Sequence, residues 1–186
     1  MLGQIRLSFR EKALKKHDYK MVKRSIKKGD VFIVGNLKVA SRVLMRGPLT
    51  HATMYVGAGQ CYHSIGHGVE RISLSKIFKI YDTCVLLRPA YLDKKSVVQS
   101  VKFIKKQKGK PYNFDTGSKG DSYYCTELVR DSLVASGVDA KLPEHKSFLS
   151  SWSYVDPMDF LISGMEVVYH SSNLCVEDGK AVRIGR

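Results

Sequence analysis

The stretch Gly109-Lys110-Pro111-Tyr112, followed by Tyr123-Tyr124-Cys125-Thr126-Glu127-Leu128-Val129, contains the residues that decide the fold. It places a cysteine where a helix is expected to begin, because Asp121 and Ser122 are good N-cap residues and apolar residues recur at helical spacing after Cys125. A thiol in a first helical turn feels the positive end of the helix dipole, which favours the thiolate. If a histidine reaches Cys125, the pair has the chemistry of a cysteine hydrolase or acyltransferase.

The bulk composition is that of an ordinary globular protein. The 186 residues suit one compact domain, with 44% hydrophobic and 26% charged residues. No apolar run approaches the ~20 residues needed to span a bilayer, and the first residues lead into basic residues rather than an apolar signal core. We therefore expect a cytoplasmic protein, or a virus- or phage-encoded one that is delivered by another route.

The net charge of +14 is concentrated near the beginning of the chain. Residues 1–28 contain ten lysines and arginines against one glutamate and one aspartate. Such a segment favours an anionic surface, which leaves a membrane, a cell-wall polymer and nucleic acid open as partners. A solvated basic helix that only keeps the protein soluble is an equally open interpretation.

Three segments are expected along the chain: a basic, helical lead-in over 1–27, a domain over 28–170, and a polar C-terminal tail over 171–186. Strands are predicted at 31–34, 51–57, 60–64, 69–72, 82–87 and 165–169, and helices at 36–46, 73–78, 94–108, from the cysteine motif to about 136, and from 157. Strands gather in the first half with helices around them, so the predicted class is α+β.

The cysteines do not suggest a metal site or a disulfide framework. Cys61, Cys84, Cys125 and Cys175 form no CxxC pair and show no regular spacing. Cys84 and Cys61 are expected in the core. We predict no metal and no cofactor.

Two of the six histidines are candidates to assist Cys125. His51 opens a predicted strand, and His63 lies on the predicted partner strand of the same hairpin. Cross-strand neighbours come within ~5 Å at Cβ, so a base at His51 oriented by His63 is geometrically plausible. A histidine satisfied within ordinary packing remains the alternative at either position.

Taken in order, these motifs resemble the circularly permuted branch of the NlpC-type papain-like superfamily, the YiiX-like cysteine hydrolases. The matching elements are Gly29-Asp30-Val31-Phe32, Thr50-His51, Gly57-Ala58-Gly59, His63 with Gly68-Val69, Gly109 to Tyr112, and Tyr124 to Val129. The resemblance spans about residues 28–169. It implies a papain-like fold in which a small antiparallel sheet or barrel packs against helices.

The resemblance also implies roles for individual residues. Cys125 would be the nucleophile, His51 the general base and later the acid, and His63 the residue that orients His51. The backbone N–H of Cys125 and a hydroxyl of Tyr112 or Tyr124 would bind the oxyanion. Permuted relatives often carry a carboxylate at the third position, and an imidazole there would stabilise an imidazolium less.

The function expected from this resemblance is that of a cysteine amidase or peptidase. It would cleave a peptide or peptidoglycan-stem amide through a thioester. One alternative is a thiol deacylase or acyltransferase acting on a lipid acyl group at an anionic membrane. Another is a basic virion- or nucleic-acid-associated protein that only retains the scaffold.

Overall fold

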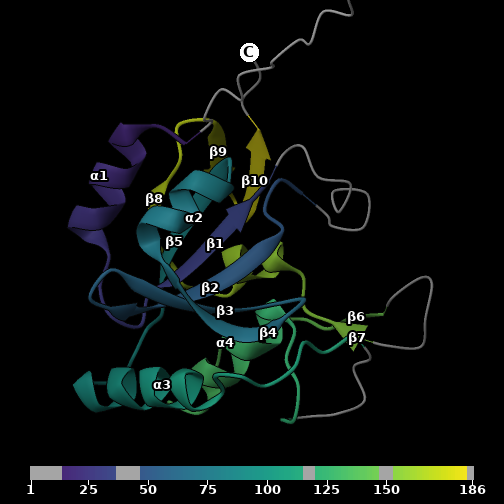
Figure 1. The fold of residues 1–186 in the computed structure, drawn as a ribbon. Helices are drawn as coiled ribbons and strands as arrows, with labels where there is room; N and C mark the ends of the chain where they lie inside the picture. Colours follow the sequence, from purple (N-terminus) through teal and green to yellow (C-terminus); the bar gives the residue numbers. More distant parts are fainter. Residues whose placement is uncertain (1–13, 37–46, 115–119, 147–152, 184–186) are drawn as a thin grey trace, which may run out of the picture.

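A computed structural model describes residues 14–36, 47–114, 120–146 and 153–183. Its main sheet is built from β1 (Val31–Gly35), β2 (His51–Gly57), β3 (Gln60–Ile65), β4 (Gly68–Ser73), β5 (Thr83–Arg88) and β8 (Glu166–His170). These six strands lie in the order β4-β3-β2-β1-β5-β8, and every neighbouring pair is antiparallel (Figure 1).

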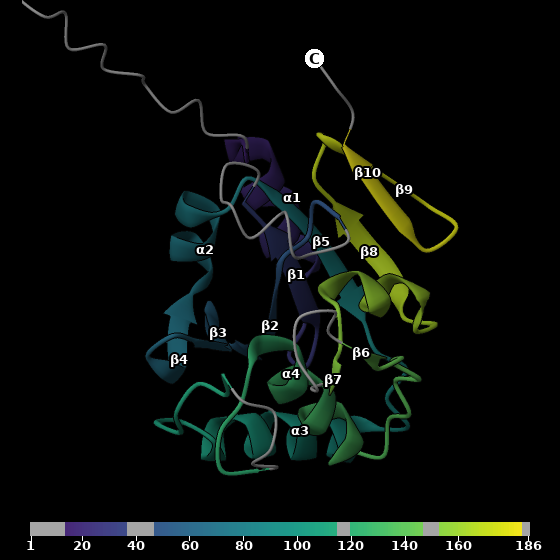
Figure 2. The same ribbon diagram turned by 90° about the vertical axis from the view of Figure 1, so that its right-hand side faces the viewer.

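Helices lie on both sides of this sheet. They are α1 (Lys16–Ser25), α2 (Leu74–Ile80), α3 (Lys94–Lys106), α4 (Cys125–Val134) and the short 3-10 helix η2 (Pro157–Ile162). Figures 1 and 2 show α3 and α4 together at the bottom of the view, away from α1 and α2. Two small two-stranded sheets complete the described chain, β6 (His145–Lys146) with β7 (Ser153–Tyr154) and β9 (Leu174–Glu177) with β10 (Lys180–Arg183).

The core is divided by the sheet into two clusters, because successive side chains of a strand point to opposite faces. On β1, Ile33 joins the cluster that contains Ile104 of α3 and Leu128 of α4. Its neighbour Phe32 joins the cluster that contains Ile77 of α2. The continuous apolar run of β1 is therefore explained by burial on both faces.

The predicted fold class is confirmed: the protein combines helices with an antiparallel sheet, and this sheet is open rather than closed into a barrel. The predicted strands correspond to β1 to β5 and β8, and the predicted helices at 73–78 and 94–108 correspond to α2 and α3. The predicted helix at 36–46 lies, apart from Asn36, outside the described residues. No helix within the described ranges is both long and apolar enough to cross a membrane.

Both ends of the described chain pack against the domain. In α1, Val22 is buried and Asp18 accepts a hydrogen bond from the Tyr169 hydroxyl at 2.6 Å. Residues 174–183, expected in a polar tail, form the β9–β10 hairpin, in which Leu174 and Ala181 join the larger core cluster. Burial of these two apolar side chains holds an otherwise polar segment in place. The basic residues before 14 lie outside the described part of the chain.

Gly68, the first residue of β4, packs closely against Lys110 in the segment that precedes the cysteine. Its φ of 101° lies in the left-handed region, and a Cβ there would overlap the carbonyl oxygen of Lys110. This close approach allows the amide of Val69 to donate to that carbonyl at 2.8 Å, while Gly109 donates to the Val69 carbonyl at 2.9 Å. The Gly-Val dipeptide thus fixes residues 109–110 against the edge of the sheet.

We expect Gly68→Ala to lower the free energy of unfolding by about 2–4 kcal/mol, because the new methyl group combines a strained φ with a backbone overlap. Urea denaturation measures this change. The matched control is Gly66→Ala, at a position where a Cβ would meet no atom within 4 Å. Equal stability of the two variants would contradict the structural role assigned to Gly68.

Candidate active site

The candidate site is built around the first turn of α4, where Cys125 is the first helical residue and its side chain is buried. The cap is Tyr124, and Glu127 accepts a hydrogen bond from the Tyr124 amide at 3.3 Å. The predicted caps Asp121 and Ser122 are therefore wrong, because the helix begins after them. The helical start at the cysteine is correct.

Three contacts fix the start of α4 beside the sheet. Ser64 of β3 donates a hydrogen bond to the Tyr123 carbonyl at 2.5 Å, immediately before the cap. Thr126 donates to the Val155 carbonyl at 2.7 Å on the other side of the helix. Asn113 donates to Glu127 at 3.3 Å. These contacts bring Cys125 to the sheet end at which β2 begins.

His51 and His63 lie in direct contact. Nε2 of His51 is 2.9 Å from Nδ1 of His63, and both side chains are buried. Their rings meet edge to face, with an interplanar angle of 76°. The hairpin expected from the sequence thus carries both histidines, and their imidazoles lie in contact.

Two observations relate Cys125 to this pair through neighbouring residues. The ladder between β2 and β3 starts at the pair Met54 and Tyr62, two residues beyond Ala52. The amide of Ala52, the residue that follows His51, faces the Cys125 sulfur and lowers its pKa. Tyr81 links the two groups as well: its ring stacks on His51 at 5.7 Å, and the charge of Cys125 contributes to raising its pKa.

The ionisation of Cys125 differs from the expectation that a helix start favours the thiolate. Burial is the largest effect and raises the pKa of the Cys125 thiol. The amides of Ala52, Thr126 and Cys125 itself lower that pKa, as the helix start predicts, but they do not outweigh burial. The group at rest is therefore a neutral thiol.

The two histidines are also neutral at rest. Burial, followed by the charge of His63, lowers the pKa of His51 to about 3. Burial likewise lowers the pKa of His63, although the nearby carboxylate of Glu70 acts in the opposite direction. A neutral imidazole beside a neutral thiol is suited to accept the proton as the sulfur attacks, rather than before.

Glu70 is a member of the site that the sequence analysis did not identify. It lies opposite His63 in the ladder between β3 and β4, and its Oε1 is 3.4 Å from Nε2 of His63. Its side chain is 42% exposed, so this contact is partly solvated. A carboxylate thus lies beyond His63, at the ring nitrogen opposite the one that contacts His51.

The contacts of Glu70 determine which nitrogens carry protons. An ionised carboxylate only accepts, so His63 donates its Nε2–H to Glu70 and keeps a lone pair on Nδ1. His51 then donates its Nε2–H to that lone pair, which leaves Nδ1 of His51 as its own acceptor. Both N–H groups therefore donate in the direction of Glu70, and the remaining acceptor is Nδ1 of His51.

The two tyrosines predicted to bind an oxyanion lie in different surroundings. Burial, followed by the charge of Cys125, raises the pKa of Tyr112, so its hydroxyl stays protonated close to the sulfur. The hydroxyl of Tyr124 accepts a hydrogen bond from the Val155 amide at 3.2 Å. The charge of Cys125 acts on Tyr112 and is not among the causes that raise the pKa of Tyr124, so Tyr112 is the better candidate to donate to a bound substrate.

The remaining cysteines have no comparable surroundings. All four cysteines are free thiols, and burial raises the pKa of Cys61 to about 12. Cys84 is fully buried in the core, as predicted. Among the described residues, no group of three or more His, Cys, Asp or Glu side chains could hold a metal ion.

The buried neutral His51 predicts a loss of stability in acid. An unfolded histidine takes up a proton near pH 6.5 and the folded one only near pH 3, so the unfolded state binds more protons between these values. Stability is then complete above pH 6.5 and falls as the pH decreases, by about 2 kcal/mol from His51 at pH 5. Urea unfolding at pH 7 and pH 5 measures this difference. His51→Gln should reduce it, and an unchanged difference in the variant would contradict the assignment.

Comparisons with known proteins identify the family and the fold of the chain. A family model for permuted papain-like amidase enzymes, the YaeF/YiiX or C92 family, matches residues 25–158. The crystal structure of the metalloprotein YiiX from Escherichia coli O157:H7 is similar, with a TM-score of 0.56 and 20% identity over 66% of this chain and 72% of that one. At this identity the likeness shows the fold alone. No curated protein matches significantly.

Proposed function

The chain belongs to the permuted papain-like amidases of the YaeF/YiiX type, and from this membership we propose that it hydrolyses a peptide or peptidoglycan-stem amide through a thioester on Cys125. The observation that carries the proposal is the 2.9 Å contact between Nε2 of His51 and Nδ1 of His63, which leaves Nδ1 of His51 as the nitrogen that would accept the proton of the thiol. The match to the family model includes Cys125, His51 and His63.

In the first half of the reaction, the Cys125 sulfur attacks the carbonyl carbon and its proton passes to Nδ1 of His51. The Cys125 amide and the Tyr112 hydroxyl donate to the oxyanion that forms. When this intermediate collapses, the C–N bond breaks, the imidazolium returns its proton to the leaving amine, and a thioester remains on Cys125. His63 stabilises the imidazolium by accepting its Nε2–H.

In the second half, His51 takes a proton from water, and the hydroxide attacks the thioester carbon. The C–S bond breaks, the Cys125 sulfur recovers a proton from His51, and a carboxylic acid leaves. In both halves of the reaction, Nδ1 of His51 transfers the proton and its Nε2–H donates to His63. The contact with His63 therefore orients His51 for acylation and for hydrolysis of the thioester.

A substrate panel tests the proposal. Peptides, γ-glutamyl dipeptides, muropeptides and acyl phospholipids are incubated with the wild-type protein and with Cys125→Ala, and products are identified by mass spectrometry. We expect a new amine and a new carboxylate from an amide substrate with the wild type only. Hydrolysis of the lipid alone would support the deacylase alternative, and product formation by Cys125→Ala would overturn the role of the thiol.

We expect Glu70→Gln to lower kcat/KM about 2–5-fold, because a half-exposed charge at the far end of the series contributes only modestly. The loss should appear in kcat rather than KM, since Glu70 lies beyond both histidines. A pH–rate profile of the variant separates an electrostatic role from a structural one, because loss of the carboxylate lowers the pKa of His63 further and moves the acid limb to lower pH without changing the fold. An unchanged profile and rate would exclude Glu70 from the site.

A further inference from the structure

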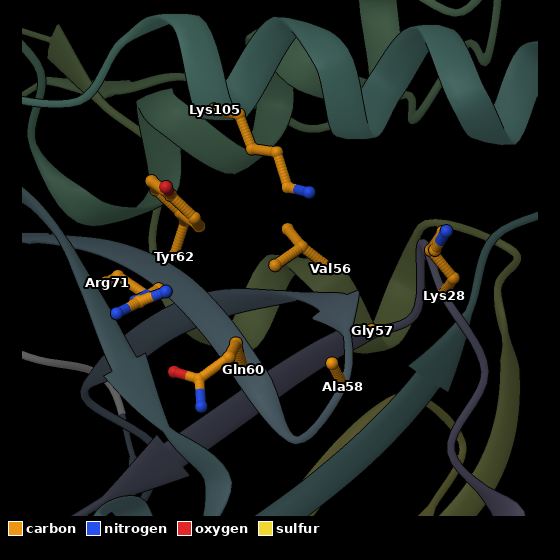
Figure 3. A pocket seen from close by; sticks show the side chains of 8 residues that line it. All are labelled: Lys28, Val56, Gly57, Ala58, Gln60, Tyr62, Arg71 and Lys105. Atoms are coloured by element: carbon orange, nitrogen blue, oxygen red, sulfur yellow. The ribbon is translucent and has the colours of Figure 1, made fainter.

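A second site lies on the opposite face of β3 and β4 from the two histidines. His63 and Glu70 are cross-strand partners, and so are their neighbours Tyr62 and Arg71. Because side chains alternate along a strand, Tyr62 and Arg71 point away from His63 and Glu70. They line a cavity of about 380 Å³ between the β2–β3 hairpin and α3 (Figure 3).

Three cations surround this cavity. Lys105 extends toward it from α3, Arg71 lies on β4, and Lys28 lies beside the hairpin glycine Gly57 (Figure 3). All three side chains are exposed, and no acidic residue is among those that line the cavity. With the residues that the structure describes, none of these cations forms an ion pair.

Lys28 is held in this position by the shape of the hairpin. A Cβ on Gly57 would lie 3.0 Å from Cε of Lys28, and the φ of Gly57 is 95°. Because Gly57 has no side chain, the aliphatic part of the Lys28 side chain can lie against the turn. The sequence analysis used this glycine only as a hairpin signal.

The floor of the cavity is less polar than its rim. Val56 and Tyr62 are buried there and belong to the larger core cluster. Gln60 adds an amide beside them. Three positive charges over an apolar and aromatic floor suit a compact dianion attached to a carbon body, because a guanidinium and two ammonium groups match phosphate oxygens. The volume is within the range of small-molecule sites.

We propose that this cavity binds a phosphomonoester, either as a small soluble molecule or as the headgroup of a membrane lipid. The phosphate contacts Arg71, Lys105 and Lys28, and the carbon body lies on Val56 and Tyr62. The site is separate from the two histidines, since Tyr62 and Arg71 lie on the opposite face of the sheet from His63 and Glu70. Binding there does not depend on the amidase proposal.

Calorimetry with phenyl phosphate at physiological salt tests the site. We expect saturable binding at one site per chain, about fivefold weaker in Arg71→Gln and in Lys105→Gln, and weaker still when both are combined. The matched control is Lys102→Gln, which removes an exposed lysine one turn earlier on α3 and outside the cavity. Phenol, which lacks the phosphate, should not bind.

Further arms identify the source of the phosphate. Inositol 4-phosphate tests the soluble form, and vesicles containing phosphatidylinositol 4-phosphate, compared with vesicles of phosphatidylinositol, test the lipid form. Binding of either that is lost in the Arg71→Gln, Lys105→Gln double variant supports the proposal. Absence of binding by every phosphomonoester, or an equal loss in Lys102→Gln, would overturn it. Cys125→Ala should bind normally, so failure of the amidase proposal is distinguishable.

Discussion

Cys125→Ala is expected to reduce amide hydrolysis by about 10⁴-fold or more, because it removes the sulfur on which the proposed thioester forms. Intact mass spectrometry during turnover should show the acyl group of the substrate on the wild-type protein and on no variant that lacks this thiol. The thermal stability should change little, since only one sulfur atom is removed.

The matched control for this prediction is Cys175→Ala on the β9–β10 hairpin. Cys175 is a free thiol too, but it is only partly buried, and its pKa is raised by its hydrogen bond with Glu177, followed by desolvation and the charge of Glu177. Full activity of this variant, together with the loss in Cys125→Ala, assigns the reaction to a single sulfur. Equal activity of both variants would mean that the thioester is not formed on Cys125.

The pairing of His51 with His63 was predictable from the sequence because it depends on one hairpin. The turn at Gly57-Ala58-Gly59 sets the register of β2 against β3, and local register fixes which side chains are neighbours. The same reasoning would have identified Glu70. The turn at residues 66–67 pairs Ile65 with Gly68, and two steps further back it pairs His63 with Glu70.

Other features of the site depend on contacts between distant segments, which a single sequence does not contain. Tyr81 follows α2 and stacks on His51 only because α2 packs on that face of the sheet. The protonation of Cys125 depends on how deeply α4 is buried, whereas the helix start alone suggested a thiolate. Likewise, Leu174 packs into the larger core cluster and so holds the β9–β10 hairpin in place, but the polar sequence around it did not predict this contact.

His51→Gln is expected to lower kcat by about 10³-fold or more, because it removes the acceptor for the thiol proton and the donor to the leaving amine in one change. The rate should depend on His51 more strongly than in an enzyme whose cysteine is already a thiolate before the substrate binds. The pKa of Cys125 is raised by burial, so without His51 the thiol has to lose its proton to solvent.

The residual activity of His51→Gln should therefore increase with pH through the alkaline range, whereas the wild type, with His51 neutral above about pH 3, should show no such rise near neutrality. Full pH–rate profiles of both proteins measure this difference. His17→Gln, on the exposed side of α1, is the matched control and should retain the wild-type profile. A variant at His51 that kept the wild-type rate and profile would assign the base to another group and would leave the contact between His51 and His63 as packing alone.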